Sequence, residues 1–353
     1  MVPLIFIIAV LGIIVLALVI GNMMLRAARK RYETSMPEEG VMVPAGDHRL
    51  FALIKGEGRP PVVFENCLGG HAFLWSLIQE KLSLKTTTIS YDRAGNGWSE
   101  DRKERATSDA VVFELRTALR NLGFEGPYIF VSHSIGAIYT EHFARLFPES
   151  IAGIVFVDPI STDVSRLDEV SSTTSSKYGT TEAKMKRNQR SATLSRIGIK
   201  ALLRHSLQRG LGLDRLRLNE EQRRLLVDYY VLPRPYAISA AEMNNLAESC
   251  ELIATLGPFP EVPIKIIRHD SKRYIARLMN DGYSIEEAKQ VEETWRNLHQ
   301  KMLDLSTRSE YLEAKETGHS ILYDDAEVII NAVEDLLNSE KFEDLQEGTS
   351  KGD

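Results

Sequence analysis

The sequence predicts an α/β fold with a mostly parallel sheet, and three observations carry this prediction. Short buried strands alternate with amphipathic helices over residues 41–160 and again over residues 261–338, as βα units around a parallel sheet do. Residues 161–260 contain no convincing strand, so we expect a helical insertion there. Residues 128–147 read as strand, sharp turn and helix in direct succession.

The amino-acid composition indicates a folded domain and argues against several classes of binding site. Its 353 residues are 43% hydrophobic and 26% charged, enough for a full hydrophobic core. The net charge of -6 provides no basic surface for nucleic acid, so we expect no nucleic-acid partner. Cys67 and Cys250 are far apart and are expected to be free, buried thiols. No metal-ligand spacing of Cys and His is present, so neither a metal nor an organic cofactor is expected.

The N-terminal residues predict a membrane anchor. Residues 4–25 are apolar except for Gly12, Gly21 and Asn22, and about 20 such residues cross a hydrocarbon core of about 30 Å. We therefore expect a transmembrane helix over residues 1–25. A cleaved signal peptide is the alternative, but no basic residue precedes the apolar stretch and no Ala-x-Ala-like site follows it.

A basic cluster, Arg26, Arg29, Lys30 and Arg31, follows the apolar stretch and begins a juxtamembrane linker over residues 26–40. Positive charge on the C-terminal side of a span predicts that this side is cytoplasmic. The expected location is the cell membrane, crossed once, with the globular domain in the cytoplasm.

The strands of the sheet follow from short apolar runs bounded by turn residues. Residues 41–43 and 50–54 predict an antiparallel hairpin. Further strands are expected at residues 61–65, 86–91, 128–131, 151–157, 263–268 and 311–314. Two capping boxes, Ser239 with Glu242 and Ser284 with Glu287, predict helix starts. The charged tail over residues 339–353 is expected to be disordered.

The sharp turn presents a serine. Residues 128–136 read Tyr-Ile-Phe-Val-Ser-His-Ser-Ile-Gly, so small residues stand two positions before and two after Ser134. This is the Gly-x-Ser-x-Gly pattern of a strained strand-to-helix turn that exposes a nucleophilic hydroxyl, with Ser132 in place of the first glycine. We interpret Ser134 as a nucleophile.

A second block strengthens this interpretation. Residues 91–99 read Tyr-Asp-Arg-Ala-Gly-Asn-Gly-Trp-Ser. Together the two motifs resemble the α/β-hydrolase superfamily, in particular its serine esterase-like members. The resemblance implies the α/β-hydrolase fold, with residues 161–260 as a helical cap. It gives the second block an architectural role, in which Gly95 and Gly97 permit a tight turn and Asp92 accepts hydrogen bonds from its N–H groups.

The resemblance also implies a catalytic triad in the chain order serine, acid, histidine. Ser134, Asp270 and His319 occur in this order, each just after an expected strand. Asp158, which follows the strand after the nucleophile, is the alternative acid. The backbone N–H groups of Leu68 and Ile135 are the expected oxyanion hole.

The function implied is acyl transfer to water. A serine at the turn argues against the superfamily branches that attack through a carboxylate. A small-molecule carboxylic ester is the expected substrate, and the apolar insertion beside the membrane helix favours a lipid-like one. Peptidase, thioesterase and lactonase chemistry use the same triad, and a catalytically silent binding protein is the alternative from another class.

Overall fold

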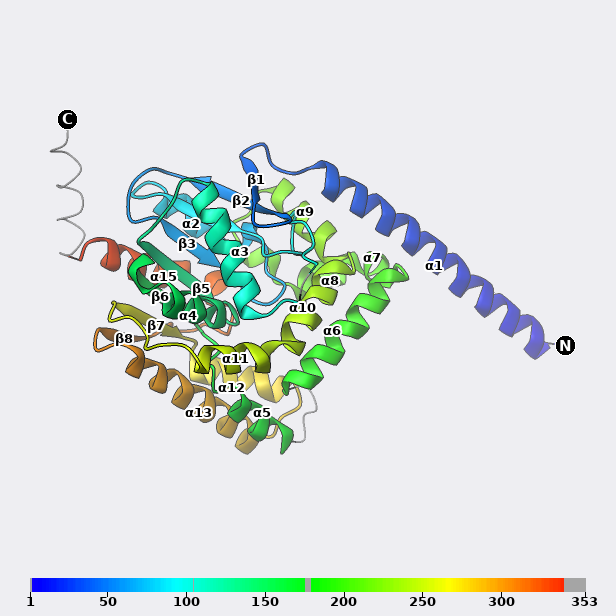
Figure 1. Cartoon of the computed structure of the whole chain (residues 1–353). Helices are drawn as coiled ribbons and strands as arrows, with labels where there is room; N and C mark the ends of the chain where they lie inside the picture. Colours follow the sequence, from blue (N-terminus) through cyan, green and yellow to red (C-terminus); the bar gives the residue numbers. More distant parts are fainter. Residues whose placement is uncertain (1, 104, 175–178, 340–353) are drawn as a thin grey trace.

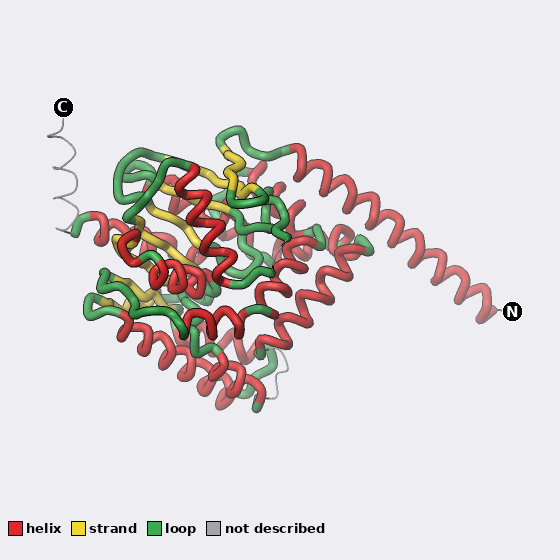
Figure 2. The backbone as a smooth tube through the Cα atoms, in the orientation of Figure 1, coloured by secondary structure: helices red, strands yellow, loops and turns green. Residues whose placement is uncertain are grey.

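A mixed eight-stranded sheet forms the centre of the described chain, which comprises residues 2–103, 105–174 and 179–339 of the computed structural model (Figures 1 and 2). The strand order is β1-β2-β4-β3-β5-β6-β7-β8. The hairpin β1/β2 is antiparallel, β2 also pairs antiparallel with β4, and the other neighbours are parallel. The strands are β1 (Gly40–Pro44), β2 (Arg49–Lys55), β3 (Val62–Glu65), β4 (Thr88–Tyr91), β5 (Tyr128–His133), β6 (Ile151–Val157), β7 (Ile264–Arg268) and β8 (Ser309–Glu313).

Helices precede, connect and follow these strands. Those outside the stretch between β6 and β7 are α1 (Val2–Thr34), α2 (Ser76–Leu82), α3 (Ser108–Asn121), α4 (Gly136–Leu146), α12 (Ser271–Asn280), α13 (Ile285–Met302), α14 (Ile321–Asp324) and α15 (Ala326–Leu337). Short 3₁₀ turns occur at η1 (Ala72–Trp75), η2 (Pro148–Ser150), η3 (Leu213–Arg215) and η4 (Leu303–Leu305). The predicted mostly parallel sheet flanked by helices is thus confirmed.

The sheet is covered on both faces, as its nearly continuous apolar strands require. Successive side chains of a strand point to opposite faces, so each face draws on alternate residues. The face under α2 and α15 contains Val62, Phe64, Ile129, Val131, Val155 and Val157. The face under α3 and α4 contains Val63, Phe130, Ile154, Phe156, Ile264 and Ile266. Both β5 and β6 are therefore buried along their whole length.

All the described elements between β6 and β7 are helical, and we call this stretch the insertion. They are α5 (Ser165–Ser172), α6 (Thr181–Arg196), α7 (Ile199–Leu202), α8 (Arg204–Gly210), η3, α9 (Glu220–Tyr230), α10 (Arg234–Asn244) and α11 (Leu246–Ala254). The capping box predicted at Ser239 and Glu242 is wrong, because Ser239 lies inside α10 and donates to the carbonyl of Pro235. The box at Ser284 and Glu287 is confirmed by both of its hydrogen bonds.

Helix α1 does not end with its apolar part. It continues through Thr34, so the residues after 25, predicted as a linker, are largely helical. Leu25, Ala28 and Tyr32 recur at helical spacing and are buried in the core. Within the described residues α1 is the one helix long and apolar enough to cross a membrane, and Figure 1 shows its N-terminal part projecting from the body. Apart from Ser339, the predicted disordered tail lies outside the described residues.

Side chains of Arg31 and Tyr32 join the end of α1 to the rest of the molecule. The guanidinium of Arg31 donates through Nε and Nη2 to the two carboxylate oxygens of Asp228 in α9, both at 2.8 Å. The ring of Tyr32 stacks on Trp98, with ring centroids 4.6 Å apart. Since Asp228 is fully buried, its charge depends on this partner and on Arg204. The end of α1 is therefore part of the fold.

Candidate active site

Ser134 occupies a strained turn at the carboxyl end of β5. Its φ is +58°, in the left-handed region that non-glycine residues rarely adopt. The surrounding hydrogen bonds impose this conformation, since Ser134 N–H donates to the carbonyl of Val157 at 3.1 Å and Ser134 C=O accepts from Ile160 N–H at 3.0 Å. Helix α4 starts two residues later, at Gly136. The predicted strand, turn and helix are confirmed.

Gly136 is required by the packing of this turn. A Cβ at this position would lie 2.9 Å from the backbone oxygens of both Glu65 and Asn66. The start of α4 therefore presses directly on the loop that follows β3. This contact brings the loop containing Leu68 next to the turn containing Ile135, and Leu68 and Ile135 share one apolar cluster. Neither amide N–H has an acceptor among the described residues.

His319 lies in the loop between β8 and α14 and contacts Ser134. Its Nε2 is 3.0 Å from Ser134 Oγ, and its Nδ1 is 2.6 Å from Asp158 Oδ2. A carboxylate only accepts, so Nδ1 carries the proton and donates to Asp158. Nε2 of the neutral ring is then free to accept the proton of the serine hydroxyl. The structure thus brings together Ser134, His319 and the alternative acid, Asp158.

The predicted pairing of Asp270 with His319 is wrong. Asp270 is the N-cap of α12, where Oδ1 accepts from the N–H groups of Lys272 and Arg273 at 2.8 and 3.1 Å. Its Oδ2 accepts from Glu316 N–H at 3.2 Å. Although burial opposes it, these N–H groups lower the pKa of Asp270. The free donors at the helix start have bound the carboxylate, because aspartate is a preferred N-cap residue.

The carboxylate of Asp158 accepts hydrogen bonds from the imidazoles of both His319 and His269. Asp158 directly follows β6, has a φ of +43° and is fully buried. Besides His319, it contacts Nδ1 of His269 with Oδ1 at 2.7 Å and Oδ2 at 2.8 Å. Burial alone would raise the pKa of Asp158, but His269, and to a lesser extent His319, outweigh burial and lower this pKa well below its ordinary value.

His269 is itself held between two carboxylates. Its Nε2 lies 2.7 Å from Glu292 Oε2 of α13, while Nδ1 faces Asp158. Burial disfavours the charged ring, but the two carboxylates prevail and raise the pKa of His269 to about 9. Glu292 is in turn hydrogen-bonded to Arg268. At neutral pH a buried row of alternating charges, Asp158⁻, His269⁺, Glu292⁻ and Arg268⁺, therefore lies next to His319.

Sequence reasoning missed three residues of this arrangement. His269 contacts Asp158 through Nδ1 and Glu292 through Nε2, and His133 donates from Nε2 to the carbonyl of His319 at 2.8 Å. The His133 ring also lies against the His319 ring, with centroids 4.9 Å apart. No spacing signal marks Glu292, which lies within a regular helix. His133 directly precedes Ser134, and His269 directly precedes Asp270. Their position beside these candidate residues was the one sequence feature that could have indicated a part in the site.

Arg93 fixes the loop between β3 and α2. It is 2% exposed, and it donates to Glu65 Oε1 at 2.7 Å and to the carbonyls of Asn66 and Cys67 at 2.6 and 2.9 Å. From the other side, Glu242 of α10 accepts from Nε and Nη2 of Arg93. Burial disfavours the guanidinium charge, but Glu242 and Glu65 raise the pKa of Arg93 well above its ordinary value. One cation thus joins the loop to the insertion.

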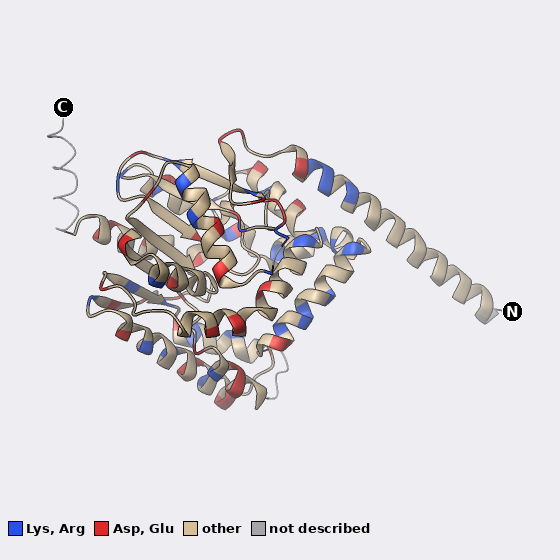
Figure 3. Ribbon diagram, viewed as in Figure 1, with Lys and Arg blue, Asp and Glu red and all other residues tan. Residues whose placement is uncertain are grey.

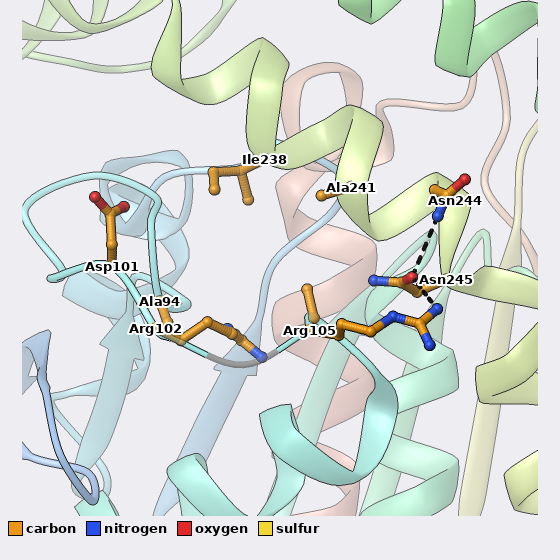
Figure 4. Close-up of a pocket in the computed structure, with 9 residues that line it drawn as sticks. Ala94, Asp101, Arg102, Arg105, Ile238, Ala241, Asn244 and Asn245 are labelled. Carbon is orange, nitrogen blue, oxygen red and sulfur yellow. Dashed lines mark hydrogen bonds between the residues drawn. The ribbon is translucent and has the colours of Figure 1, made fainter.

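A cavity of about 370 Å³ lies between the loop after β4 and helix α10 (Figure 4). Arg105 donates to Asn245 Oδ1 at 2.8 Å at one side of it. Its lining consists of Ala94, Asp101, Arg102, Arg105, Ala106, Ile238, Ala241, Asn244 and Asn245. None of Ser134, Asp158 and His319 contributes to this lining, so the cavity is separate from the candidate active site.

The buried charge of His269 predicts a specific pH dependence of stability. A pKa raised from 6.5 to about 9 contributes stability that is complete below pH 6.5 and is lost as the pH rises through about 9. The melting temperature of the protein should therefore fall over this interval. His269→Gln should remove that part of the slope, whereas His205→Gln, which changes an exposed histidine, should keep it. An unchanged slope in the His269 variant would contradict the assignment of the charge.

Comparison with known proteins agrees with this geometry. Residues 62–332 match the alpha/beta hydrolase family. An AB hydrolase superfamily protein of Gibberella zeae is 25% identical over 320 residues, covering 83% of this chain and 92% of that protein.

Two solved structures share the fold. A thermophilic esterase from Thermogutta terrifontis has a TM-score of 0.56 at 18% identity, covering 84% of this chain and 97% of its own. The Cif epoxide hydrolase from Acinetobacter nosocomialis has a TM-score of 0.66 at 14% identity, covering 91% and 96%. With a family match over most of its length and a serine, histidine and aspartate aligned at the edge of its sheet, the chain belongs to the alpha/beta hydrolase family.

Proposed function

We propose that the chain is a membrane-anchored serine hydrolase that cleaves a carboxylic ester or a related acyl substrate. The observation that carries this proposal is the hydrogen-bonded line from Ser134 Oγ through His319 to Asp158, with distances of 3.0 and 2.6 Å. A hydroxyl, a base within reach of its proton and an acid that orients the base are what nucleophilic acyl transfer needs.

In the proposed mechanism, Ser134 Oγ attacks the acyl carbonyl while His319 Nε2 takes the hydroxyl proton. Asp158 keeps the imidazole in the required tautomer and stabilises the imidazolium that forms. The N–H groups of Leu68 and Ile135 are proposed to stabilise the oxyanion. His319 then protonates the leaving group, and an acyl-enzyme remains. Water, deprotonated by His319, attacks this ester and releases the acid and the free serine.

The serine distinguishes between the chemistries seen on this fold. The solved structures with the same fold include both an esterase and an epoxide hydrolase, so the fold alone does not identify the reaction. Attack through a carboxylate would need an acidic side chain where this chain has Ser134. Peptidase, thioesterase and lactonase activities need the same three groups and stay open as substrate alternatives. The silent binding protein is disfavoured, because Ser134 and His319 already lie at hydrogen-bonding distance.

The surroundings of the serine favour an acyl group with a substantial apolar part. Helices α6, α10 and α11 of the insertion place apolar side chains in the cluster that contains Ile135, the neighbour of Ser134. The residues they contribute are Met185, Met243, Leu246, Cys250 and Ile253. We propose that the insertion acts as a cap, and that these side chains form the side of the site that receives the acyl chain.

The structure favours an uncleaved anchor over a signal sequence. Cleavage after the apolar stretch would cut a continuous helix whose next two turns are packed in the core. Tyr32 would be separated from the span although its Oη bonds Nε2 of buried His71 at 2.8 Å. Signal peptides are removed without loss to the mature fold. We therefore propose that α1 remains as a single membrane span.

We expect an organophosphonate probe to label the wild-type protein at Ser134 and to leave Ser134→Ala unlabelled, because only the activated hydroxyl attacks phosphorus. Ser320→Ala, which removes a hydroxyl beside His319, is the matched control and should stay labelled. Mass spectrometry of the modified peptide identifies the serine. Equal labelling of wild type and Ser134→Ala, or no labelling of a folded wild type, would refute the hydrolase proposal.

The choice of acid predicts unequal effects of two identical substitutions. Asp158→Asn replaces the carboxylate by an amide whose NH2 group can donate to His319 Nδ1 and favour the wrong tautomer, so it should lower kcat by about 10⁴. Asp270→Asn should leave kcat nearly unchanged, because asparagine caps a helix about as well as aspartate. Steady-state kinetics on one activated ester measure both, and circular dichroism checks that each variant is folded. The reverse ranking would show that Asp158 is not the acid.

The anchor predicts where the protein is found. The full-length chain should stay in the membrane pellet after alkaline carbonate extraction, and protease added to intact cells should spare the globular domain. The reason is that Arg26, Arg29, Lys30 and Arg31 follow the span. A soluble form whose first residue lies near 26 would indicate signal cleavage, and digestion from outside would reverse the orientation.

A further inference from the structure

A long stretch of the insertion is basic although the whole chain is acidic. Residues 183–213, here called the basic segment, contain eight Lys and Arg and no Asp or Glu, while the chain has a net charge of -6. Figure 3 shows the blue residues along α6 and around α7 and α8, on the side of the body where α1 joins it. Positive charge is thus concentrated beside the proposed membrane span.

The basic segment contacts α1 directly. The backbones of Gly21 and Gly198 meet so closely that a Cβ on Gly21 would lie 2.7 Å from the carbonyl oxygen of Gly198. Asn22 Nδ2 also donates to the carbonyl of Ile197 at 3.2 Å. The turn between α6 and α7 is therefore fixed against one position along the span.

That position sets the depth of the basic segment. Gly21 lies 17 residues beyond Leu4, which corresponds to about 26 Å along the axis at about 1.5 Å per residue. The hydrocarbon core of a bilayer is about 30 Å thick. If α1 spans the membrane from Leu4, the contact between Gly21 and Gly198 lies near the end of the hydrocarbon core, and the turn between α6 and α7 lies at the headgroups.

The exposed side chains of the basic segment suit this location. Within the described insertion, the exposed large apolar side chains are Leu194, Ile197 and Leu203, which are 42, 41 and 55% exposed. All three belong to the basic segment. Four of its exposed cations have no acidic partner among the described residues: Arg187, Arg190, Arg196 and Arg209. Apolar side chains interspersed with free cations are typical of a surface that lies in an anionic lipid interface.

We propose that the basic segment rests on the anionic headgroups of the membrane that holds α1, with Leu194, Ile197 and Leu203 inserted below them. This inference rests on the proposed span but not on the proposed catalysis. It makes the insertion the part of the globular domain nearest the lipid. The partner is a phospholipid surface with net negative charge, on the same side as Arg26 and Arg31.

The test measures contact with acyl chains at three sites of the full-length protein. Vesicles of phosphatidylcholine and phosphatidylglycerol, with bromine-labelled acyl chains, quench tryptophan fluorescence only at close range. The variants are Leu203→Trp in the basic segment, Met23→Trp in α1 as a positive control, and Leu84→Trp after α2 as an exposed control, since Leu84 is 86% exposed. The three native tryptophans are common to all variants.

Leu203→Trp should be quenched like Met23→Trp, and Leu84→Trp should show no quenching above the native background. Quenching of Met23→Trp without quenching of Leu203→Trp would overturn the inference and leave the span intact. Absence of quenching at both sites would refute the span and the inference together. Labelling of Ser134 by the phosphonate in the same vesicles reports separately on the hydrolase proposal.

A separate experiment tests whether the contact of the basic segment with lipid depends on charge. In vesicles of phosphatidylcholine alone, quenching of Leu203→Trp should fall toward the background while that of Met23→Trp persists, because the anionic headgroups are missing. Adding Arg196→Gln and Arg209→Gln to Leu203→Trp should reduce quenching in the anionic vesicles. Adding Arg296→Gln, on α13, should not. Equal quenching in both lipids and in all variants would show that the contact does not depend on the basic charges.

Discussion

The buried guanidinium of Arg93 is the interaction on which the site region most depends. It binds the side chain of Glu65 at the end of β3, two carbonyls of the next loop, and Glu242 of the insertion. Without it, the two buried carboxylates would lose the cation that both of them contact, and breaking a buried ion pair costs on the order of 3–5 kcal/mol. Because α4 presses on the same loop at Gly136, Arg93 joins three separate parts of the chain: the nucleophile turn, the loop of Leu68 and the insertion.

The second constraint is the alternation of charge behind Ser134. The carboxylate of Asp158 accepts from His319 although it is fully buried, and burial alone would raise its pKa. The charged ring of His269 compensates for this burial, and Glu292 in turn supports His269. The acid therefore keeps its negative charge without contact with water. The cost is a pair of ionised groups in the interior, which is tolerated because each of them is hydrogen-bonded on both sides.

Helix α1 would connect the site region to the proposed membrane. Its apolar part makes few contacts with the body, whereas its last turns contribute Tyr32 to the core and Arg31 to an ion pair with Asp228. A rigid helix that is both span and core element would hold the globular domain at a fixed height and angle above the bilayer. The proposed cap would then face the lipid, the phase in which a substrate with a long acyl chain accumulates.

Local signals in the sequence predicted most of the fold. Period-two and period-3.6 patterns located the strands and the sheet helices, and the small residues around Ser134 predicted its turn. His319 was predicted because a Gly-His pair follows the last strand. The helix through residues 26–34 was missed because its many exposed basic residues give the stretch the composition of a polar linker. The buried residues Leu25, Ala28 and Tyr32 show that it is an amphipathic helix.

The sequence by itself thus predicted the fold class, the candidate nucleophile Ser134 and its candidate base His319, all of which depend on neighbours close along the chain. It could not choose between Asp158 and Asp270, since both follow parallel strands. Only the tertiary structure decided this, because the choice depends on where distant groups meet. The N–H groups at the start of α12 bind Asp270 locally, while the charged ring of His269, itself paired with Glu292, compensates the buried charge of Asp158 beside His319.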